Sequence, residues 1–376
     1  MSTGARKKWV GVGAGLIAVL AGLMLWRSGR EDGPSAEAPA PTASDSASTG
    51  GGRKAPASSA SAPVATPPPQ DMLRAVPCEL DALVEEYRQG KGSPAWRRYV
   101  MEQLRGILEN LPPEQLWAKV EAEQDPEVLE ALTSLWVMRF NLTGDSTVLE
   151  RVLDKVGRES DPGRKAVMVR ALRASDEPAS DVLAKAESTR QAYRQWVKDP
   201  APEVREAVVG NLKDEAGRNF GRTRGVAEQA VALASEAGDP KTAAGLLSAS
   251  SIEAARTPAV DSVRQLLEKS EHPEVRAAAA KTLGTVAVGE AERTMKALTG
   301  RFATEGSREV RSAILESIAR LGLSGAVPVL QKLKGVDPAM DGELDTWLTL
   351  LASQPQTWNL LLRDKQALEL GRGQKG

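Results

Sequence analysis

Beyond residue 70, apolar residues recur with the spacing of an α-helix. Four segments begin at Val128, Val204, Val275 and Val310, and each has apolar or small residues at the third, fourth and eighth positions after the valine. That spacing places them on one face of a helix with 3.6 residues per turn. Recurring prolines divide the chain into helices of about 10–18 residues with short connections. The pattern predicts an all-α protein, because no run of alternating apolar and polar residues indicates a strand.

The helical segments repeat at a nearly constant interval. Val275 and Val310 are 35 residues apart, and Val204 and Val275 are 71 residues apart, which is two intervals. Repeats of this length are typical of helix pairs that stack on one another, each covering the apolar face of its neighbour. At about 38 residues per pair, residues 71–376 would hold roughly seven or eight pairs.

The repeated segments resemble HEAT repeats, in particular the short bacterial HEAT-like type. The segment DPAPEVREAVVGNL, from Asp199 to Leu212, is the best match, followed by HPEVRAAAAKTLG and SREVRSAILESIARLG. The resemblance extends from about Asp125 to Leu333 and implies a right-handed α-solenoid. The motif is degenerate, so it concerns the fold and does not specify a function.

The resemblance also implies an ion-pair ladder. In HEAT repeats an Asp in the turn and an Arg on the second helix bond to one another and to adjacent repeats. Asp199 and Arg205 match that pair, and Glu305 and Arg311 match it approximately. Arg276 has Ser270 where the acid is expected, and Asp125 has Ala131 where the Arg is expected, so we expect a ladder broken in places. The structural repeat positions are Asp199, Val204, Arg205, Val275, Arg276, Val310 and Arg311.

An uninterrupted apolar run lies near the N-terminus. The segment from Trp9 to Trp26, WVGVGAGLIAVLAGLMLW, contains only apolar residues and glycine, with a tryptophan at each end. Eighteen residues of helix span about 27 Å, close to the ~30 Å hydrocarbon core of a bilayer. Tryptophan favours the interface of a membrane. We expect residues 9–26 to form a transmembrane helix that contacts the lipid bilayer.

A cleaved signal peptide is the main alternative to this anchor. The basic start fits a signal peptide, but the run ends in LMLWR, and the small-residue pattern at 36–38 lies far downstream. Three basic residues at 6–8 precede the span and two, Arg27 and Arg30, follow it, which favours a cytoplasmic N-terminus. The helix pairs would then lie in the periplasm of a bacterium, attached to its inner membrane. Gly11 and Gly15 could also support a homodimer through the span.

The chain therefore divides into five regions. A short basic segment (1–8) precedes the span (9–26), and residues 27–70 are mostly Ala, Pro, Ser, Thr and Gly. With almost no large apolar side chain, residues 27–70 are expected to be a disordered linker. The solenoid is expected at 71–370, with a short disordered tail at 371–376. Tryptophans cluster in the first and last repeats, as expected for atypical terminal repeats that complete the core, although one or two could line a binding groove.

The composition mainly argues against particular classes of function. The formal charge is −1, and beyond residue 70 there are 42 basic and 46 acidic residues, without the basic excess usual for nucleic-acid binding. There is one histidine, His272, expected in an exposed turn, and one cysteine, Cys78. One histidine and one cysteine, far apart in sequence, are too few for most metal sites built from these residues. We expect no catalytic residue, no cofactor and no metal.

The sequence favours a non-catalytic scaffold that binds a protein or peptide through its repeat surface. Two other functions stay open. One is an enzyme or enzyme accessory, because some HEAT-like proteins resemble bilin lyases. The other is nucleic-acid binding, as in HEAT-like DNA glycosylases, for which the candidate residues are Arg97, Arg98, Arg190, Arg194 and Trp196. No nucleic acid is expected as a partner, because these residues more simply form solvated helix faces.

Overall fold

The computed structural model describes residues 79–173, 187–219, 224–249, 252, 255–355 and 357–373. Within these ranges the chain forms helices and no strand, so the all-α prediction is confirmed there. The chain divides into two units, Met1–Thr66 and Pro67–Gly376, and every described residue belongs to the second. The predicted span (9–26), the predicted linker (27–70) and Cys78 therefore lie outside the described residues.

Helices of the second unit come in consecutive pairs. The first helices of the eight described pairs are α2 (Leu80–Gln89), α4 (Pro113–Ala122), α6 (Ser146–Arg158), α9 (Glu187–Trp196), α11 (Arg224–Glu236), α13 (Thr257–Lys269), α15 (Val288–Thr304) and α17 (Val327–Leu333). Their partners are α3 (Pro94–Ile107), α5 (Pro126–Thr143), α7 (Pro162–Ala171), α10 (Pro202–Asn219), α12 (Pro240–Ser248), α14 (Pro273–Leu283), α16 (Arg308–Gly322) and α18 (Asp341–Ala352). A last helix, α19 (Trp358–Gly373), packs on α18.

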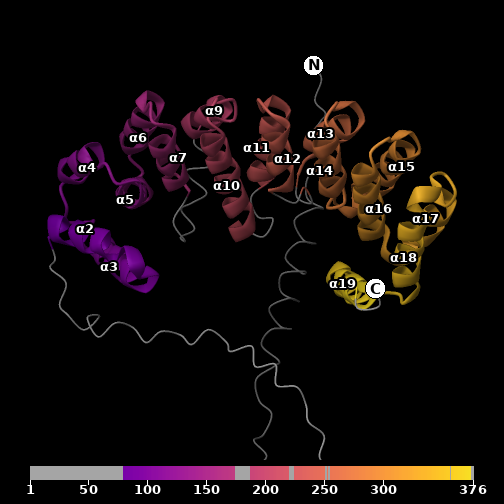
Figure 1. The fold of residues 1–376 in the computed structure, drawn as a ribbon. Coiled ribbons are helices and arrows are strands. Elements are labelled where there is room, and N and C mark those ends of the chain that lie inside the picture. Colours follow the sequence, from indigo (N-terminus) through magenta and orange to yellow (C-terminus); the bar gives the residue numbers. More distant parts are fainter. Residues whose placement is uncertain are drawn as a thin grey trace, which may run out of the picture. The chain divides into compact units, whose positions relative to one another are not determined.

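The pairs stack into two layers. The second helices from α5 to α18 each pack on the next second helix, and the first helices from α6 to α17 do the same in the other layer. Figure 1 shows these two layers side by side, with the first helices along one rim of the row. Each inner pair is thus covered by the pair before it and the pair after it, as the repeat interval predicts.

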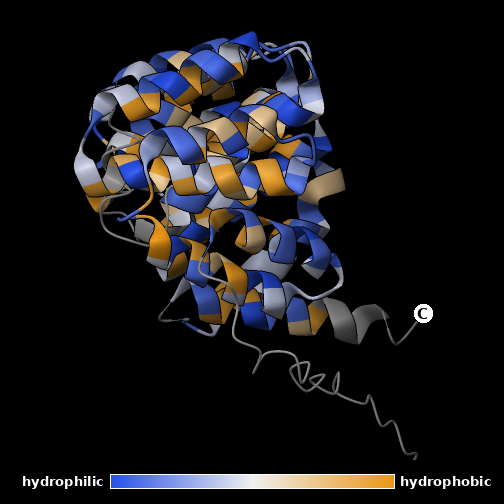
Figure 2. Ribbon diagram, turned by 90° about the vertical axis from the view of Figure 1, so that its left-hand side faces the viewer, coloured by the Kyte–Doolittle hydropathy of each residue, from blue (hydrophilic) through white to orange (hydrophobic). Residues whose placement is uncertain are grey.

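The four valines that define the repeat all lie in the second-helix layer. Val128, Val204, Val275 and Val310 belong to α5, α10, α14 and α16 and are at most 3% exposed. Their predicted position on the buried helix face is therefore confirmed. Figure 2 shows the same arrangement across the stack, where helices carry hydrophobic and hydrophilic residues on different faces.

Aspartate and proline together start several helices. Asp125, Asp161 and Asp239 each precede a proline at the first helical position, and each carboxylate accepts a hydrogen bond from a backbone N–H of the first turn. Such an N-cap satisfies donors that the helix itself cannot pair, and it is worth about 1 kcal/mol. Proline fits beside it because its missing N–H would have been unpaired anyway. The dipeptide therefore marks both the turn and the start of the second helix.

Tryptophans complete the core near both ends of the stack. The rings of Trp117 and Trp136 lie 4.8 Å apart, and those of Trp347 and Trp358 stack at 5.9 Å. Trp117, Trp136 and Trp347 are at most 2% exposed, so their predicted role in the core is confirmed. Between the ends, the core consists mainly of leucine, valine and alanine.

One described stretch, Arg308–Leu333, is long and apolar enough to cross a membrane. It consists of α16, a 3₁₀ turn (Leu323–Ala326) and α17. Many of its apolar side chains, such as Ile314 and Ile318, are fully buried against neighbouring helices, whereas Leu321 is half-buried. Burial among helices explains this composition, since a helix covered on most sides is apolar on most sides.

The ends of α5 and α18 provide a matched pair of substitutions. Gly144 ends α5 with a φ of 69°, and Gln354 follows α18 with a φ of 51°. This left-handed conformation favours glycine over residues with a Cβ. We expect Gly144→Ala to lower the free energy of unfolding by about 1 kcal/mol. Gln354→Gly should leave it unchanged or raise it by up to about 1 kcal/mol. Urea unfolding followed by circular dichroism measures both; equal effects of the same sign would contradict this explanation.

Candidate functional site

Ion pairs connect successive repeats. The guanidinium of Arg205 on α10 lies 2.7 Å from a carboxylate oxygen of Asp239, which is the N-cap of α12 in the next pair. It also donates to the backbone oxygen of Asp199, at 2.5 Å. Arg205 thus bonds to Asp199 through the backbone oxygen of that residue, whereas the carboxylate that it pairs with comes from the following repeat.

The same arrangement recurs along the stack. The carboxylate of Asp199 forms an ion pair with Lys165 of the preceding helix pair, with 2.7 Å between Oδ2 and Nζ. Asp125 forms the same kind of ion pair with Lys91, at 2.6 Å. Arg311 contacts Asp337 in the same way. In each case an acid at or beside a helix start accepts a cation from the repeat before it. The ladder thus continues at Asp125, where the sequence comparison within one repeat suggested a break.

The most buried step of this ladder joins Arg276 to Glu305. Nε and Nη2 of Arg276 each donate to the Glu305 carboxylate at 2.8 Å, and Arg301 adds a further bond at 2.8 Å. Arg276 also donates to the backbone oxygen of Ser270, the residue that stands where the acid was expected. Glu305 is 1% exposed, so removal of one partner would leave a buried charge, which typically costs about 3–5 kcal/mol.

Hydrogen bonding decides the ionisation of Glu305. Burial raises the pKa of this carboxyl, but the bonds from Arg276, the backbone N–H of Ser307 and Arg301 outweigh burial and lower the pKa to about 2. Each bond favours the charged form. The carboxylate therefore stays ionised and holds two repeats together over the ordinary pH range.

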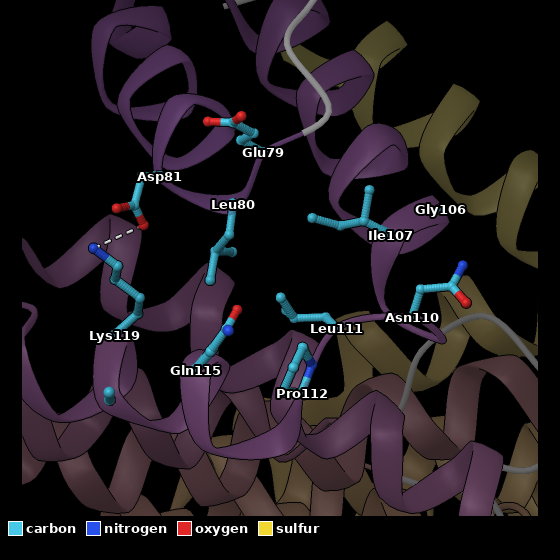
Figure 3. A pocket seen from close by; sticks show the side chains of 11 residues that line it. Glu79, Leu80, Asp81, Gly106, Ile107, Asn110, Leu111, Pro112, Gln115 and Lys119 are labelled. Carbon is cyan, nitrogen blue, oxygen red and sulfur yellow. Dashed lines mark ion pairs between the residues drawn. The ribbon is translucent and has the colours of Figure 1, made fainter.

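A groove opens beside the first two helix pairs. It has a volume of about 690 Å³ and lies between the start of α2, the end of α3 and α4. Leu80 from α2, Ile107 from α3 and Leu111 from the following turn point into the same space (Figure 3). Ile107 and Leu111 are half-buried, so the groove presents aliphatic surface to solvent.

Polar groups surround this aliphatic floor. Asp81 on α2 forms an ion pair with Lys119 on α4, with 2.8 Å between Oδ1 and Nζ, at one edge of the groove (Figure 3). Exposed amides of Asn110 and Gln115 stand at other edges. An apolar floor with a few polar groups around it is typical of sites that bind peptide segments or small molecules. Sequence reasoning missed this groove, because its residues come from three helices and a turn and form no local motif.

The charged face of the second-helix layer has a different character. Glu130 on α5 pairs with Arg170 on α7 and with Arg173, just after the end of α7, and Arg173 also pairs with Asp214 on α10. Glu206 on α10 pairs with Lys241 on α12 at 2.6 Å. Charges of opposite sign thus alternate from helix to helix over these four helices.

The residues considered for nucleic-acid binding do not converge. Arg97 and Arg98 lie on α3, whereas Arg190 and Arg194 lie on α9, several helices further along the stack. Arg97 pairs with Glu127 and Arg194 with Glu236, and Trp196 is 4% exposed. A buried indole cannot stack on a base.

The single histidine lies where the sequence predicts. His272 is an exposed N-cap residue of α14 and makes no side-chain cap hydrogen bond. Within the part of the chain that the structure describes, no three His, Cys, Asp or Glu side chains gather as metal ligands would.

Comparison with known families agrees with the helix stack. Residues 227–319 and 260–339 match HEAT repeats. HEAT repeats therefore occur in residues 227–339, from α11 to the 3₁₀ turn at Pro338–Met340. The predicted resemblance is confirmed over this part of the chain. Among curated proteins, none matches the chain significantly.

The Glu305 carboxylate predicts a specific loss of stability in acid. Its pKa is about 2 in the folded protein and about 4.3 in an unfolded chain, so its ionised form stabilises the fold above pH ~4.3. That contribution is lost as the pH falls from about 4.3 towards 2. We expect Glu305→Gln to be less stable than wild type at pH 7, with the difference shrinking across this interval. Urea unfolding at a series of pH values measures it, and Glu292→Gln, at an exposed position of α15, is the control.

Proposed function

We propose that this chain is a non-catalytic scaffold that binds another protein through its stack of HEAT repeats, arranged as a right-handed α-solenoid. The observation that carries the proposal is the continuous layer of second helices, from α5 to α18, each packed on the next. Stacks of this kind present extended surfaces, and such surfaces are suited to long protein partners. The HEAT repeats at residues 227–339 support the same conclusion.

The charges of the second-helix layer suggest how a partner is selected. Glu130, Arg173, Asp214 and Lys241 alternate in sign along neighbouring helices. A partner with a charge of opposite sign facing each of these residues would form an ion pair with every one of them. A partner of uniform charge would be repelled at every second helix. Charge patterns of this kind contribute mainly to specificity and to the rate of association.

We further propose that residues 9–26 anchor the scaffold in the inner membrane of a bacterium, with the N-terminus in the cytoplasm and the helix stack in the periplasm. The apolar run between Trp9 and Trp26 supports the anchor, and the basic residues at 6–8 support the orientation. Residues 27–70 would then serve as the tether between membrane and stack. Association of two spans through Gly11 and Gly15 would give a homodimer.

Cross-linking in membranes tests the scaffold. The full-length tagged chain is cross-linked, purified and analysed by mass spectrometry beside two charge-reversal variants. We expect a reproducible protein partner that is recovered at least about tenfold less with Arg173→Glu, which removes favourable pairing in the second-helix layer. Glu268→Lys, on α13 in the other layer, is the matched control and should retain the partner. Equal recovery with both variants would contradict binding through this layer.

Fractionation tests the anchor. A chain lacking residues 9–26 should move from the membrane fraction to the soluble fraction, because the ~27 Å apolar helix is the proposed lipid contact. The wild-type chain should resist extraction by high salt and alkaline carbonate. A truncated chain that stays in the membrane fraction would overturn the anchor and leave the helix stack itself as the membrane contact.

A further inference from the structure

The two ends of the helix stack are covered differently. At the C-terminal end, α19 lies against α18, with Trp358 stacked on Trp347 and Leu361 fully buried. At the other end, the groove beside α2, α3 and α4 leaves Ile107 and Leu111 half-buried, and no described element covers it. Terminal repeats must protect their apolar faces from water. Among the described residues, therefore, no element covers this groove in the way that α19 covers α18.

Backbone donors add to this aliphatic floor. Glu79 is the N-cap of α2 and makes no side-chain cap hydrogen bond, so the first N–H groups of the helix have no partner of that kind. Such groups favour carbonyl oxygens or anionic groups of a neighbouring chain. Because Glu79, Leu80 and Asp81 all line the groove, an extended segment lying in it could place its carbonyl oxygens near the helix start.

The charge at this edge favours a cation. Asp81 and Lys119 neutralise each other across 2.8 Å, whereas the exposed carboxylate of Glu79 has no partner among the described residues. The groove therefore fits a short segment that combines aliphatic side chains with one basic residue. Its aliphatic side chains would cover Ile107 and Leu111, and its basic residue would approach Glu79.

The sequence immediately before the groove has this chemistry. Residues 71–78 read DMLRAVPC, with Met72, Leu73 and Val76 as apolar residues and Arg74 as the cation. This segment continues directly into Glu79, itself a residue of the groove. Six residues in extended conformation reach about 20 Å, enough for Leu73 to return across the groove. Proline at 77 disfavours a helical continuation of α2 into this segment.

We propose that residues 71–78 bind back into this groove and act as the N-terminal cover of the helix stack. Leu73 and Met72 would pack on Ile107 and Leu111, and Arg74 would pair with Glu79. Because the segment belongs to the same chain, its effective concentration at the groove is in the millimolar range, and weak contacts are sufficient. A bound segment would also fix the point at which the upstream chain leaves the repeats. This proposal is independent of the scaffold's partner.

Disulfide trapping tests it in the full-length chain. Cys78 is the natural cysteine, so Cys78→Ser removes every native thiol. In that background, Leu73→Cys is combined with Ala118→Cys in the groove or, as control, with Lys281→Cys on α14, which is exposed as well. Under mild oxidation we expect an intrachain disulfide to form at least about tenfold faster with Ala118→Cys than with Lys281→Cys.

A charge pair at an exposed position provides the second readout. Glu79 lines the groove and is exposed, so its replacement should not disturb folding. Glu79→Arg replaces the proposed partner of Arg74 by a like charge and should slow trapping several-fold, whereas Glu79→Asp keeps the charge and should leave it nearly equal. Circular dichroism confirms that each variant is folded.

Each outcome decides the proposal. Fast intrachain trapping that responds to the sign of the charge at position 79 supports it. Equal trapping at Ala118→Cys and Lys281→Cys would show that the segment has no preferred site. Disulfides between two chains would identify a second copy as the occupant, and insensitivity to Glu79→Arg would remove the assigned contact of Arg74. Any of these three results overturns the proposal and leaves the scaffold function untouched.

Discussion

The structure depends on the covering of each helix pair by its neighbours. A pair such as α15 and α16 has apolar residues on faces that point along the stack, and α14, α13, α17 and α18 cover them. With little aromatic residue content, the core relies on many small aliphatic contacts between closely packed helices. No single pair has enough buried surface of its own, so the stability of the whole comes from the contacts between pairs.

The ion-pair ladder follows from the same geometry. Asp125, Asp239 and Asp337 each have two roles, since each accepts a backbone N–H of its own repeat and a cation from the preceding one. Asp239 shows both, with the N–H of Thr242 at 2.9 Å and the guanidinium of Arg205 at 2.7 Å. A cap and an interface contact are therefore combined in one side chain, and its loss weakens a helix and an interface together.

Local patterns predicted the elements but not their long-range partners. The valines at 128, 204, 275 and 310 were placed on the buried face correctly, because a helix face depends only on residues a few positions apart. The carboxylate that Arg205 contacts was not predicted, since Asp239 lies a full repeat away and the distance between repeats is a property of their packing. The groove was not predicted for the same reason: Leu80, Ile107 and Leu111 approach one another only after three helices have packed.

The two surfaces described here suit different tasks. The second-helix layer carries the alternating charges that, in the proposed function, would select a long partner. The groove beside α2 is small and aliphatic, and it fits a short segment such as the one that leads from the N-terminal region into the repeats. In the proposed scaffold, one surface would face a partner and the other would fix the point at which the upstream chain leaves the repeats.

The central claim is that helix pairs are stable only when they are stacked, and comparison of two fragments tests it most directly. Residues 288–322 contain the single pair α15 and α16, whereas residues 257–352 contain three pairs, from α13 to α18. Circular dichroism with urea unfolding should show the single pair largely unfolded in water and the three-pair fragment helical, with a cooperative transition. A single pair that is fully helical and unfolds cooperatively would contradict the account.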